Sequence, residues 1–322
     1  MSPSVLNVEQ TPPIVHTEDA AAILAEYDAT VEVDDTTDED RLVSQVDGHA
    51  GLMVHAGVPV TRRVIEAADF DVIARCGIGV DNVDLAAAAE RGVTVVNHPA
   101  YSVEEVATHA VSLALAGFRR LPTFDHSTRG GNWAWADGAA IDRLSENTIG
   151  LVGFGSIARR VAVLVSGFGC DVIAADPYVD GTVMRRHNVE PVEFDELWDR
   201  ANILSIHAEL TPETKGLIGR AALERLDDDA VLVNTARGPV VDTNALVETL
   251  AAGGLSFAAL DVTDPEPLPA DYELFEFENV MVTPHTGWYS ERSREELTRD
   301  IADDVGRVLA GEEPRHPVVQ VE

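Results

Sequence analysis

The chain has 322 residues, of which 45% are hydrophobic and 25% charged, a composition typical of a soluble globular protein with room for two domains. Its 56 acidic residues outnumber 23 lysines and arginines, and the resulting net charge of −33 argues against direct binding to nucleic acid. No apolar run approaches the roughly 20 residues that span a bilayer, no secretory signal is visible, and two cysteines make neither a disulfide framework nor a metal-binding pattern. We therefore expect a cytoplasmic protein without a metal ion.

The acidic residues are dispersed along the chain, and Lys215 is its single lysine. Dispersed acid with almost no lysine resembles the proteins of salt-loving cytoplasms. A net negative charge of this size keeps a protein soluble but makes it repel itself at low ionic strength. An ordinary acidic protein of a mesophile is the alternative.

The first hundred residues alternate short apolar runs with helical patterns. Strands are expected at 30–33, 51–54, 72–75 and 93–97, and helices near 20–26, 61–68 and 85–91. This alternation predicts a small parallel sheet of the doubly wound type. The first thirteen residues contain three prolines and predict a short strand or a loose arm.

A long amphipathic helix is predicted over residues 103–121, with acidic residues near its start and arginines at its end, where they suit the helix dipole. Pro122 is expected to end it. Residues 123–147 predict a loop that contains Trp133 and Trp135. Two indoles in a polar stretch indicate either a subunit interface or ordinary packing in the core.

Residues 148–177 have the order of a dinucleotide-binding βαβ unit: an apolar strand, a glycine-rich turn, a helix and a second strand that ends at Asp176. Gly153 permits the tight turn, and Gly155 lets the backbone approach a pyrophosphate at the helix N-terminus. Asp176 follows Gly155 by 21 positions, where its carboxylate could accept hydrogen bonds from a ribose diol. Ala158 replaces the third glycine. The alternative is a βα turn without a ligand.

Four further apolar runs predict strands that are covered on both faces, at 203–208, 230–234, 258–261 and 280–283. A helix is expected at 242–252. The last helix is expected to begin at Ser290 or Ser293 and to reach Leu309, with a capping box formed by Ser293 and Glu296. We expect a substrate domain over 1–99, completed by 289–322, and an NAD-binding domain over 100–288.

Three segments that follow predicted strands carry groups suited to hydride-transfer chemistry: 234–238, 261–267 and 283–288. The carboxyl ends of parallel strands meet at one edge of a sheet, so these segments are expected to face the cofactor. His285 could take the proton of an alcohol, and Glu266 is the carboxylate that would orient it. Arg237 offers a bidentate fork for a substrate carboxylate and carbonyl.

These motifs, together with the segment 75–84, resemble the D-isomer-specific 2-hydroxyacid dehydrogenase family over nearly the whole chain. The resemblance implies that Arg237 binds and polarises the substrate, Glu266 partners the histidine and His285 is the acid/base. It implies substrate contacts at His55, Arg75, Ile78, Gly79, Val80 and Trp288. It implies NAD contacts at Thr108, Gly153, Gly155, Ser156, Ile157, Asp176, His207, Ala208, Thr211, Thr235, Ala236, Asp261 and Gly287, with Asp261 holding the nicotinamide carboxamide.

Within the family, the run 285–291 is similar to the C-terminal-binding-protein branch, as are His55, Arg75 and the run 176–178. Trp288 would line the substrate pocket and favour an apolar side chain, or else pack against the C-terminal helix. Two residues depart from the family pattern: Glu209, where the family often has proline, and Ala158. Both concern the geometry of the loops near the adenosine.

The predicted fold class is α/β, with two doubly wound parallel-sheet domains, one a Rossmann domain and the other flavodoxin-like. The predicted function is the NAD-dependent interconversion of a small 2-keto acid and its D-2-hydroxy acid, by a homodimer that binds neither nucleic acid nor membrane. One alternative is 3-phosphoglycerate dehydrogenase, which needs cations for a phosphate beyond the few that this chain supplies: Arg75, Arg237, Arg62 and Arg63. The other is a non-catalytic NADH-sensing scaffold.

Overall fold

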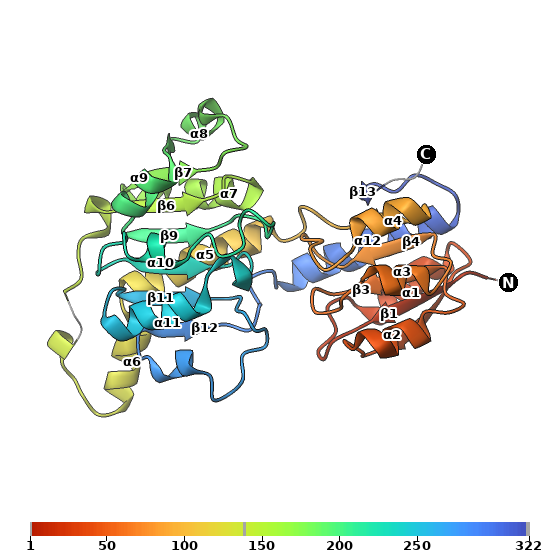
Figure 1. Ribbon diagram of the computed structural model, residues 1–322, viewed down its shortest axis with the longest axis horizontal. Coiled ribbons are helices and arrows are strands. Elements are labelled where there is room, and N and C mark those ends of the chain that lie inside the picture. Colours follow the sequence, from red (N-terminus) through yellow and green to blue (C-terminus); the bar gives the residue numbers. More distant parts are fainter. Residues whose placement is uncertain (1, 138–139, 320–322) are drawn as a thin grey trace. The chain divides into compact units, whose positions relative to one another are not determined.

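The computed structural model describes residues 2–137 and 140–319 and divides the chain into two compact units (Figure 1). Unit 1 comprises Met1–Tyr101 with Ser290–Glu322, and unit 2 comprises Ser102–Tyr289. Each unit is built around its own sheet. Among the described residues, no helix has both the length and the apolar character that a membrane span requires.

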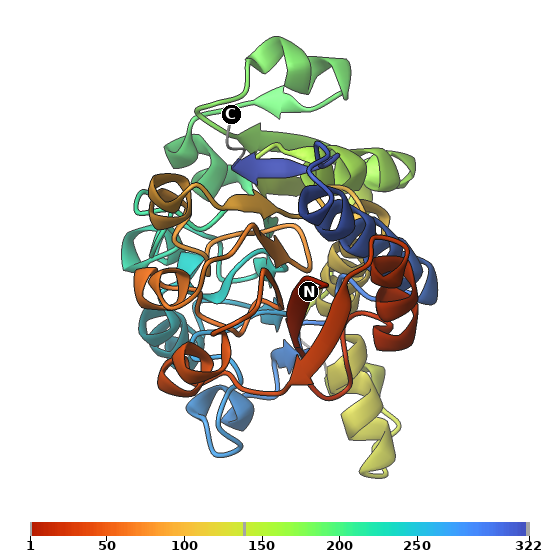
Figure 2. The same ribbon diagram turned by 90° about the vertical axis from the view of Figure 1, so that its right-hand side faces the viewer.

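The sheet of unit 1 has six strands in the order β13-β5-β4-β3-β1-β2. Its strands are β1 Ser4–Val8, β2 Thr30–Asp34, β3 Gly51–Val54, β4 Val72–Arg75, β5 Thr94–Val96 and β13 Pro317–Val319. The first five run parallel in the 2-1-3-4-5 order of flavodoxin-like sheets, which confirms the predicted class. The strand β13 (blue in Figure 2) pairs antiparallel with β5 and adds an edge strand that the sequence did not predict.

Helices cover both faces of this sheet, at α1 Thr17–Ala25, α2 Glu39–Gln45, α3 Arg62–Glu66, α4 Leu85–Arg91 and α12 Glu291–Leu309. The C-terminal helix α12 belongs to unit 1, where it packs beside α1 and against β4 and β5 (Figure 2). Leu297, Ile301 and Val305 form its fully buried stripe, at the spacing of one helix face. The helix α2 was not predicted, although Asp38 caps it by accepting a hydrogen bond from the Arg41 amide.

The helix α12 begins at a capping box, but one turn earlier than the predicted pair of Ser293 and Glu296. The Ser290 hydroxyl accepts a hydrogen bond from the Ser293 amide at 2.9 Å, and the Ser293 hydroxyl accepts one from the Ser290 amide at 2.9 Å. Ser293 is fully buried within the helix, so it occupies the third helical position and not the cap. Glu296 instead forms an ion pair with Arg292.

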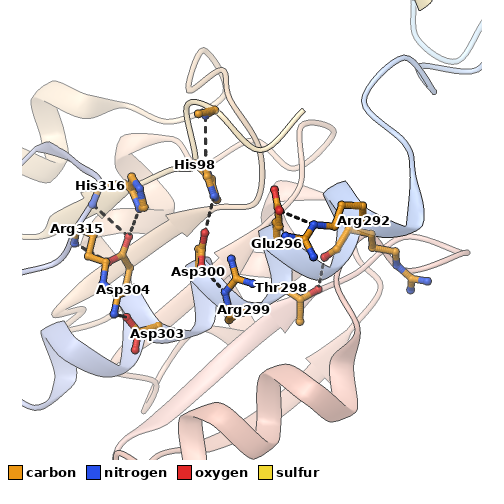
Figure 3. A network of polar contacts seen from close by, with 12 residues as sticks. His98, Arg292, Glu296, Thr298, Arg299, Asp300, Asp303, Asp304, Arg315 and His316 are labelled. Carbon is orange, nitrogen blue, oxygen red and sulfur yellow. Dashed lines mark hydrogen bonds and ion pairs between the residues drawn. The ribbon is translucent and has the colours of Figure 1, made fainter. Parts of the chain in front are cut away.

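A polar network fastens the C-terminal segment and the segment after β5 to α12 (Figure 3). The fully buried carboxylate of Asp304 accepts a hydrogen bond from His316 Nδ1 at 2.8 Å and another from the Arg315 amide at 2.6 Å. His98 donates from Nε2 to Asp300 at 2.8 Å, and its ring stacks on that of His316 with centroids 4.8 Å apart. Three segments distant in sequence are thereby joined within unit 1.

The sheet of unit 2 has seven strands, all parallel, in the order β12-β11-β10-β9-β6-β7-β8. The strands are β6 Thr148–Val152, β7 Asp171–Ala175, β8 Glu190–Pro191, β9 Ile203–Ile206, β10 Val231–Asn234, β11 Phe257–Leu260 and β12 Val280–Val282. Counted from β6, this is the Rossmann order, which confirms the predicted class. The order reverses between β6 and β9, the place where such sheets bind dinucleotides.

The helices of unit 2 are α5 Val103–Phe118, α6 Leu121–Arg129, α7 Ser156–Val165, α8 Gly181–Arg186, α9 Phe194–Arg200, α10 Arg220–Leu223 and α11 Thr243–Ala252. Single 3-10 turns lie at Trp135–Asp137, Leu144–Glu146, Ser166–Phe168, Gly238–Val240 and Glu273–Glu276. The helix α5 packs along α7 and against β9, β10 and β11. Gly117 allows this approach, because a Cβ there would lie 2.8 Å from the Phe257 ring.

The predicted helix over 103–121 and the predicted loop after it are corrected at Pro122. The helix α5 ends at Phe118, Arg120 adopts a left-handed conformation with φ of 53°, and Pro122 lies in the first turn of α6. Proline is tolerated in a first turn because the amide it lacks has no partner within the helix there. Trp133 and Trp135 follow α6 and are 91% and 89% exposed, so of the two alternatives, packing in the core does not hold for this chain.

The contact between α12 and the end of α1 gives a test of this packing. A Cβ at Gly306 would overlap the Tyr27 ring, which a hydrogen bond from its hydroxyl to Asp303 holds in place at 2.7 Å. We predict that Gly306→Ala lowers the free energy of unfolding by about 1–3 kcal/mol, because overpacking outweighs the roughly 1 kcal/mol that alanine gains in a helix. Urea denaturation measures the change. In a Tyr27→Ala background the same substitution should stabilise, and a loss of equal size there would contradict the packing argument.

Candidate functional site

The glycine-rich turn after β6 is held by the carboxylate that ends β7. Asp176 accepts a hydrogen bond from the Phe154 amide at 2.7 Å and another from the Tyr178 amide at 2.9 Å. Gly153 has a φ of 85°, which favours glycine, and a Cβ there would press on the Ala208 backbone at 3.0 Å. The turn is therefore fixed from both neighbouring strands. A carboxylate has about four lone-pair sites, so Asp176 can still accept hydrogen bonds from a diol.

The helix α7 starts directly after this turn, and its N-terminus is open to an anion. Gly155 is the N-cap and gives the helix no side-chain cap. A Cβ added at Gly155 would meet no atom within 4 Å, so the space over the turn is open. Ala158 is fully buried, which shows that a methyl group fits where the glycine-rich pattern has its third glycine. The N–H groups at the start of α7, including those of Ser156 and Ile157, suit the charge of a pyrophosphate.

The segments after β9 and β10 lie at the same edge of the sheet as the turn after β6, because these strands are parallel neighbours. His207 contacts the Ser205 hydroxyl at 2.9 Å, and burial lowers the pKa of His207 to about 4, so its ring is neutral at pH 7. Thr211 closes the loop that follows, through a hydrogen bond from its amide to the Thr214 hydroxyl at 2.8 Å. The Thr235 hydroxyl is buried and has no partner among the described residues. A buried hydroxyl without a partner is unfavourable, and a ligand at this edge would satisfy it.

The three predicted catalytic residues follow three adjacent strands of unit 2: Arg237 after β10, Glu266 after β11 and His285 after β12. His285 Nδ1 lies 2.6 Å from Glu266 Oε1, and both side chains are partly exposed, at 29% and 41%. A carboxylate at this distance fixes the ring orientation and leaves Nε2 to exchange a proton with a substrate. The structure thus brings together the histidine and the carboxylate that the sequence paired.

Close backbone packing places Arg237 beside the segment that carries Glu266. The side-chain Nδ2 of Asn234 donates to the Arg237 carbonyl at 2.9 Å, and the Arg237 guanidinium donates to the Ala236 carbonyl at 2.7 Å. A side chain at Gly238 would collide with the Thr263 carbonyl. Only glycine permits this approach, so the glycine of the 234–238 motif has a structural reason that sequence analysis did not identify.

The carboxylate of Asp261 organises the segment that carries His285. Its oxygens accept hydrogen bonds from the Thr283 hydroxyl at 2.6 Å, the Thr286 amide at 2.9 Å and the Gly287 amide at 2.8 Å. His109 from α5 lies 3.3 Å away. Burial alone raises the pKa of Asp261, but the hydrogen bonds from His109, Thr283 and the two amides outweigh it and hold the pKa below its ordinary value.

His285 itself has an unusual backbone conformation, with a φ of 51°. Its amide donates to the Asp261 carbonyl at 2.8 Å, which secures a conformation that non-glycine residues rarely adopt. Gly287 is needed two residues later, because a Cβ there would lie 2.8 Å from Asp261 Oδ2. Trp288 follows half-buried and contacts Tyr289 edge-on, with ring centroids 5.6 Å apart.

The other predicted substrate contacts form a second group, in unit 1. His55 follows β3, Arg75 ends β4, and Ile78, Gly79 and Val80 form the half-buried loop after β4. The strands are parallel neighbours, with Val54 opposite Arg75 in the register, so the group shares one sheet edge. The Arg75 guanidinium lies against Gly77 and donates to the Cys76 carbonyl at 3.2 Å.

His55 is 6% exposed and neutral at pH 7, because burial, and next the charge of Arg75, lower its pKa to about 4. Its Nδ1 accepts a hydrogen bond from the Gly57 amide at 3.1 Å. Its Nε2 is buried and has no partner in the part of the chain that the structure describes. The proton of the neutral ring therefore sits on Nε2 and is available to an acceptor.

Thr108 is the one predicted cofactor residue that comes from α5, where it is exposed. Its neighbour His109 was not predicted, and neither were Thr283 and Thr286 as partners of Asp261. Residues 109 and 261 are far apart in the sequence, so neither motif nor spacing links them. The sequence indicated close packing around Asp261 only through Gly287, which directly precedes Trp288.

The sheet of unit 2 has the strand order of a dinucleotide-binding Rossmann domain, and that of unit 1 is flavodoxin-like. Residues 111–287 match the model of the D-isomer specific 2-hydroxyacid dehydrogenase family, NAD binding domain. The chain belongs to this family, as its sequence motifs predicted, and the cofactor of the matched domain is NAD.

Similar proteins agree with this assignment. The D-3-phosphoglycerate dehydrogenase of Mycobacterium tuberculosis is 38% identical over 279 residues, which cover 86% of this chain and 52% of that protein. The chain thus spans about half the length of the curated relatives it matches. The crystal structure of the TT0316 protein from Thermus thermophilus has a TM-score of 0.88 at 35% identity, covering 98% of this chain and 100% of that chain. D-Lactate dehydrogenase from Aquifex aeolicus, complexed with NAD and lactic acid, has a TM-score of 0.87 at 25% identity and covers 99% and 100%.

The buried neutral histidine of unit 1 predicts a specific pH dependence of stability. The pKa of His55 is about 4 in the folded state against 6.5 for an ordinary histidine, so the unfolded chain takes up the proton first as the pH falls. Stability is then lost from pH 6.5 downward, by about 2 kcal/mol at pH 5 for this group. We predict that His55→Gln removes about that much of the loss between pH 7 and pH 5, measured by urea denaturation at constant KCl. Parallel curves for the two proteins would contradict the buried, neutral state of His55.

Proposed function

We propose that this protein catalyses the NAD-dependent interconversion of a small 2-keto acid and its D-2-hydroxy acid. The observation that carries the proposal is the His285–Glu266 pair, 2.6 Å apart, beside Arg237 at the edge of the NAD-binding domain. Bound NAD supplies the hydride acceptor, or the donor in the reverse direction. The remaining chemistry is a proton transfer and the binding of an anion, for which these three residues are suited.

In reduction, His285 donates a proton from Nε2 to the substrate oxygen as C2 gains a hydride, and in oxidation it takes that proton back. Glu266 holds Nδ1 and stabilises the charged ring. Arg237 polarises the carbonyl and contacts the carboxylate of the substrate. In unit 1, the loop Ile78, Gly79 and Val80 with Arg75 supplies further groups for the carboxylate, as the family resemblance implies. Trp288 remains the proposed contact for the substrate side chain.

The residues present fit NAD, because the space over Gly155 is open, α7 lacks a side-chain cap and the Thr235 hydroxyl is buried without a partner among the residues that the structure describes. The first turn of α7, with Ser156 and Ile157, would hold the pyrophosphate, and Asp176 the adenosine ribose. Asp176 also favours NAD over NADP, since a carboxylate repels a 2′-phosphate. The remaining contacts are proposed for Thr108, His207, Ala208, Thr211, Thr235, Ala236, Asp261 and Gly287.

A second candidate substrate is 3-phosphoglycerate, because the curated relatives reported above bear that name. The cations that a phosphate requires are scarce here. Arg62 and Arg63, counted as candidates in the sequence, are engaged in ion pairs with Glu90 and with Asp40. A non-catalytic NADH-sensing scaffold is the third candidate, and the intact His285, Glu266 and Arg237 disfavour it. The similarity to the C-terminal-binding-protein branch stays a prediction.

We predict that His285→Ala and Arg237→Ala each lower turnover of pyruvate-like substrates by about 10²–10⁴-fold, the usual contribution of a proton donor or an electrostatic stabiliser. Steady-state oxidation of NADH measures turnover, and fluorescence titration measures NADH affinity, which should stay within a few fold of wild type. Glu209→Gln, in the loop after β9, is the matched control, because it changes a residue outside the proton-transfer pair. Near-normal turnover in either alanine variant at saturating substrate would exclude the assigned roles.

We also propose that the protein works at high salt. Arginines at the surface are already committed to ion pairs, as in Arg200 with Glu190 and Glu196 and Arg225 with Asp195 and Asp199. The chain therefore has no further positive charges that could neutralise its 33 excess negative charges. The Debye length falls from about 10 Å at 0.1 M to about 3 Å at 1 M salt, so molar salt screens most of this repulsion.

We predict that the midpoint of thermal unfolding and the enzymatic activity both rise steeply as KCl increases from dilute buffer to a few molar. Sucrose at equal osmolarity is the control, because it favours compact states without screening charge. A melting temperature that is flat in KCl, or that rises equally in sucrose, would refute the proposal.

We propose that the partner of this chain is a second copy, bound through the arm surface formed by Leu121, Trp133 and Trp135. These side chains are 56%, 91% and 89% exposed in one copy. Residues 106–136 contain one acidic residue, Asp125, and three arginines, in a chain with 56 acidic residues. This is a place where two strongly acidic copies can meet with little repulsion.

We predict that the double variant Trp133→Ala, Trp135→Ala is monomeric in sedimentation equilibrium at 2 M KCl, where the wild type is a dimer. Exposed aromatic residues of this kind supply much of the binding energy of an interface. Tyr178→Ala is the matched control, because Tyr178 is also highly exposed, at 86%, and lies outside the arm surface. A wild-type monomer, or a double variant that dimerises normally, would contradict this proposal.

A further inference from the structure

The ring of His109, on α5, contacts the segment that carries His285. Its Nε2 lies 3.1 Å from the Thr283 hydroxyl and 3.3 Å from Asp261 Oδ1. A Cβ at Gly287 would lie 3.2 Å from Cδ2 of the ring, so the ring also packs against the backbone there. The His109 side chain is 23% exposed, whereas that of Asp261 is 2% exposed. All of these residues belong to unit 2, and His109 gives solvent protons a route to the neighbourhood of the buried carboxylate.

The hydrogen bonds determine which nitrogen of His109 carries a proton. Thr283 Oγ1 donates its single proton to Asp261 Oδ1, at 2.6 Å, so this hydroxyl can only accept from His109. Burial raises the pKa of Asp261, but its hydrogen-bond donors outweigh burial and keep the pKa below its ordinary value, so the carboxylate is ionised and can only accept as well. Nε2 of His109 is therefore a donor, and a second proton can be taken up only at Nδ1.

The charge of the pair formed by His109 and Asp261 depends on this second proton. Without it the pair carries one negative charge, and with it the pair is neutral, while Nε2 remains the donor in both states. An imidazole is the side chain that ordinarily changes its charge between pH 5 and 8. The amides of Thr286 and Gly287 hold the carboxylate in place. A proton can therefore switch the charge here without moving the acceptor.

Asp261 also has an acceptor position left for a ligand. A carboxylate has about four lone-pair sites. Oδ1 accepts from the Thr283 hydroxyl and the Thr286 amide, with His109 beside them, whereas Oδ2 accepts from the Gly287 amide. The remaining lone pair of Oδ2 suits an amide N–H, such as that of the nicotinamide, whose contact with Asp261 is proposed above.

We propose that His109 is a positioning residue whose proton sets the preference of this site for the oxidised or the reduced cofactor. The inference rests on the proposed contact between Asp261 and the nicotinamide. The nicotinamide ring of NAD⁺ carries one positive charge, and that of NADH carries none. A negatively charged pair of His109 and Asp261 stabilises the positive ring, and a neutral pair does not. Protonation of His109 therefore weakens the binding of NAD⁺ relative to NADH, and binding of NAD⁺ releases that proton to the solvent.

Other charged and titratable groups lie on the elements around His109. They include Glu105 on α5, His126 on α6, Arg160 on α7, His207 after β9, Arg237 after β10 and the pair of Glu266 and His285. Carboxyl and guanidinium groups ordinarily keep their charge between pH 5.5 and 8.5, and burial lowers the pKa of His207 to about 4. His285 is the proposed proton donor and can change its charge in this range, so it is replaced by glutamine in both proteins compared. His126 is the same in both.

The test measures the dissociation constants of NAD⁺ and NADH at pH 5.5 and pH 8.5 in His285→Gln and in the double variant His109→Gln, His285→Gln. The ratio of the two constants isolates the charge of the nicotinamide, because both cofactors carry the same riboses and phosphates. Glutamine keeps an N–H donor and takes up no proton. Fluorescence titration gives the constant for NADH, and competition against NADH gives that for NAD⁺. Both are measured at 2 M KCl, since salt screens partly buried charges much less than exposed ones.

In His285→Gln, the ratio of the NAD⁺ constant to the NADH constant should be higher at pH 5.5 than at pH 8.5 by about fivefold or more, because a charge acts more strongly in a partly buried site than in bulk water. In the double variant the ratio should change by less than about twofold, since the titrating ring is gone. An equal change in both proteins, or no change in either, would overturn the inference.

If the double variant does not fold or does not bind NADH, calorimetry of His285→Gln near pH 6.5 decides. Binding of NAD⁺ should release part of a proton, which makes the measured heat depend on the ionisation enthalpy of the buffer, and binding of NADH should release less. Equal release with both cofactors would overturn the inference. These are equilibrium measurements, so they are independent of turnover: a wild type that reduces no 2-keto acid refutes the proposed function, and the binding ratio still decides on His109.

Discussion

The buried carboxylate of Asp261 holds the segment that carries the proton-transfer histidine. It is 3% exposed, and the hydroxyl of Thr283 and the amides of Thr286 and Gly287 converge on it, with His109 of α5 beside them. Burying a charge is costly unless donors compensate it, and each hydrogen bond to a charged group is worth about 1.5–3 kcal/mol. Satisfying Asp261 therefore requires the backbone after β12 to turn inward, and this turn gives His285 its left-handed conformation.

The same constraint reaches the rest of the candidate site through close backbone packing. Gly287 permits the approach to Asp261, Gly238 permits the segment of Arg237 to pack on Thr263, and Gly153 permits the turn after β6 to pack on Ala208. Parallel strands bring these segments to one edge, and the three glycines let them come close enough to share a ligand. A substitution at one of these three glycines would displace the backbone, and it would change the chemistry of the site through that displacement.

Much of this was predictable from the sequence, since apolar runs and the glycine-rich turn predicted most strands of both sheets and the fold class, although not β8. The pairing of His285 with Glu266 followed from their places after neighbouring strands. The contact between His109 and Asp261 and the antiparallel strand β13 were not predicted, because they join segments far apart in the chain. The capping box of α12 and the role of Pro122 were predicted wrongly, because Ser290 and Ser293 both have the chemistry of a cap, and a proline can either end a helix or lie in its first turn.

Amide hydrogen exchange of Asp261→Asn tests directly whether Asp261 fixes the segment of His285. Asparagine keeps the shape but loses the charge. Its Nδ2 faces either the Gly287 amide, in place of Oδ2, or the Thr283 hydroxyl and the Thr286 amide, in place of Oδ1. We predict that exchange at residues 285–287 is at least tenfold faster than in wild type, with exchange of the amides of β6 and β7 unchanged. Equal protection of residues 285–287 in both proteins would contradict it.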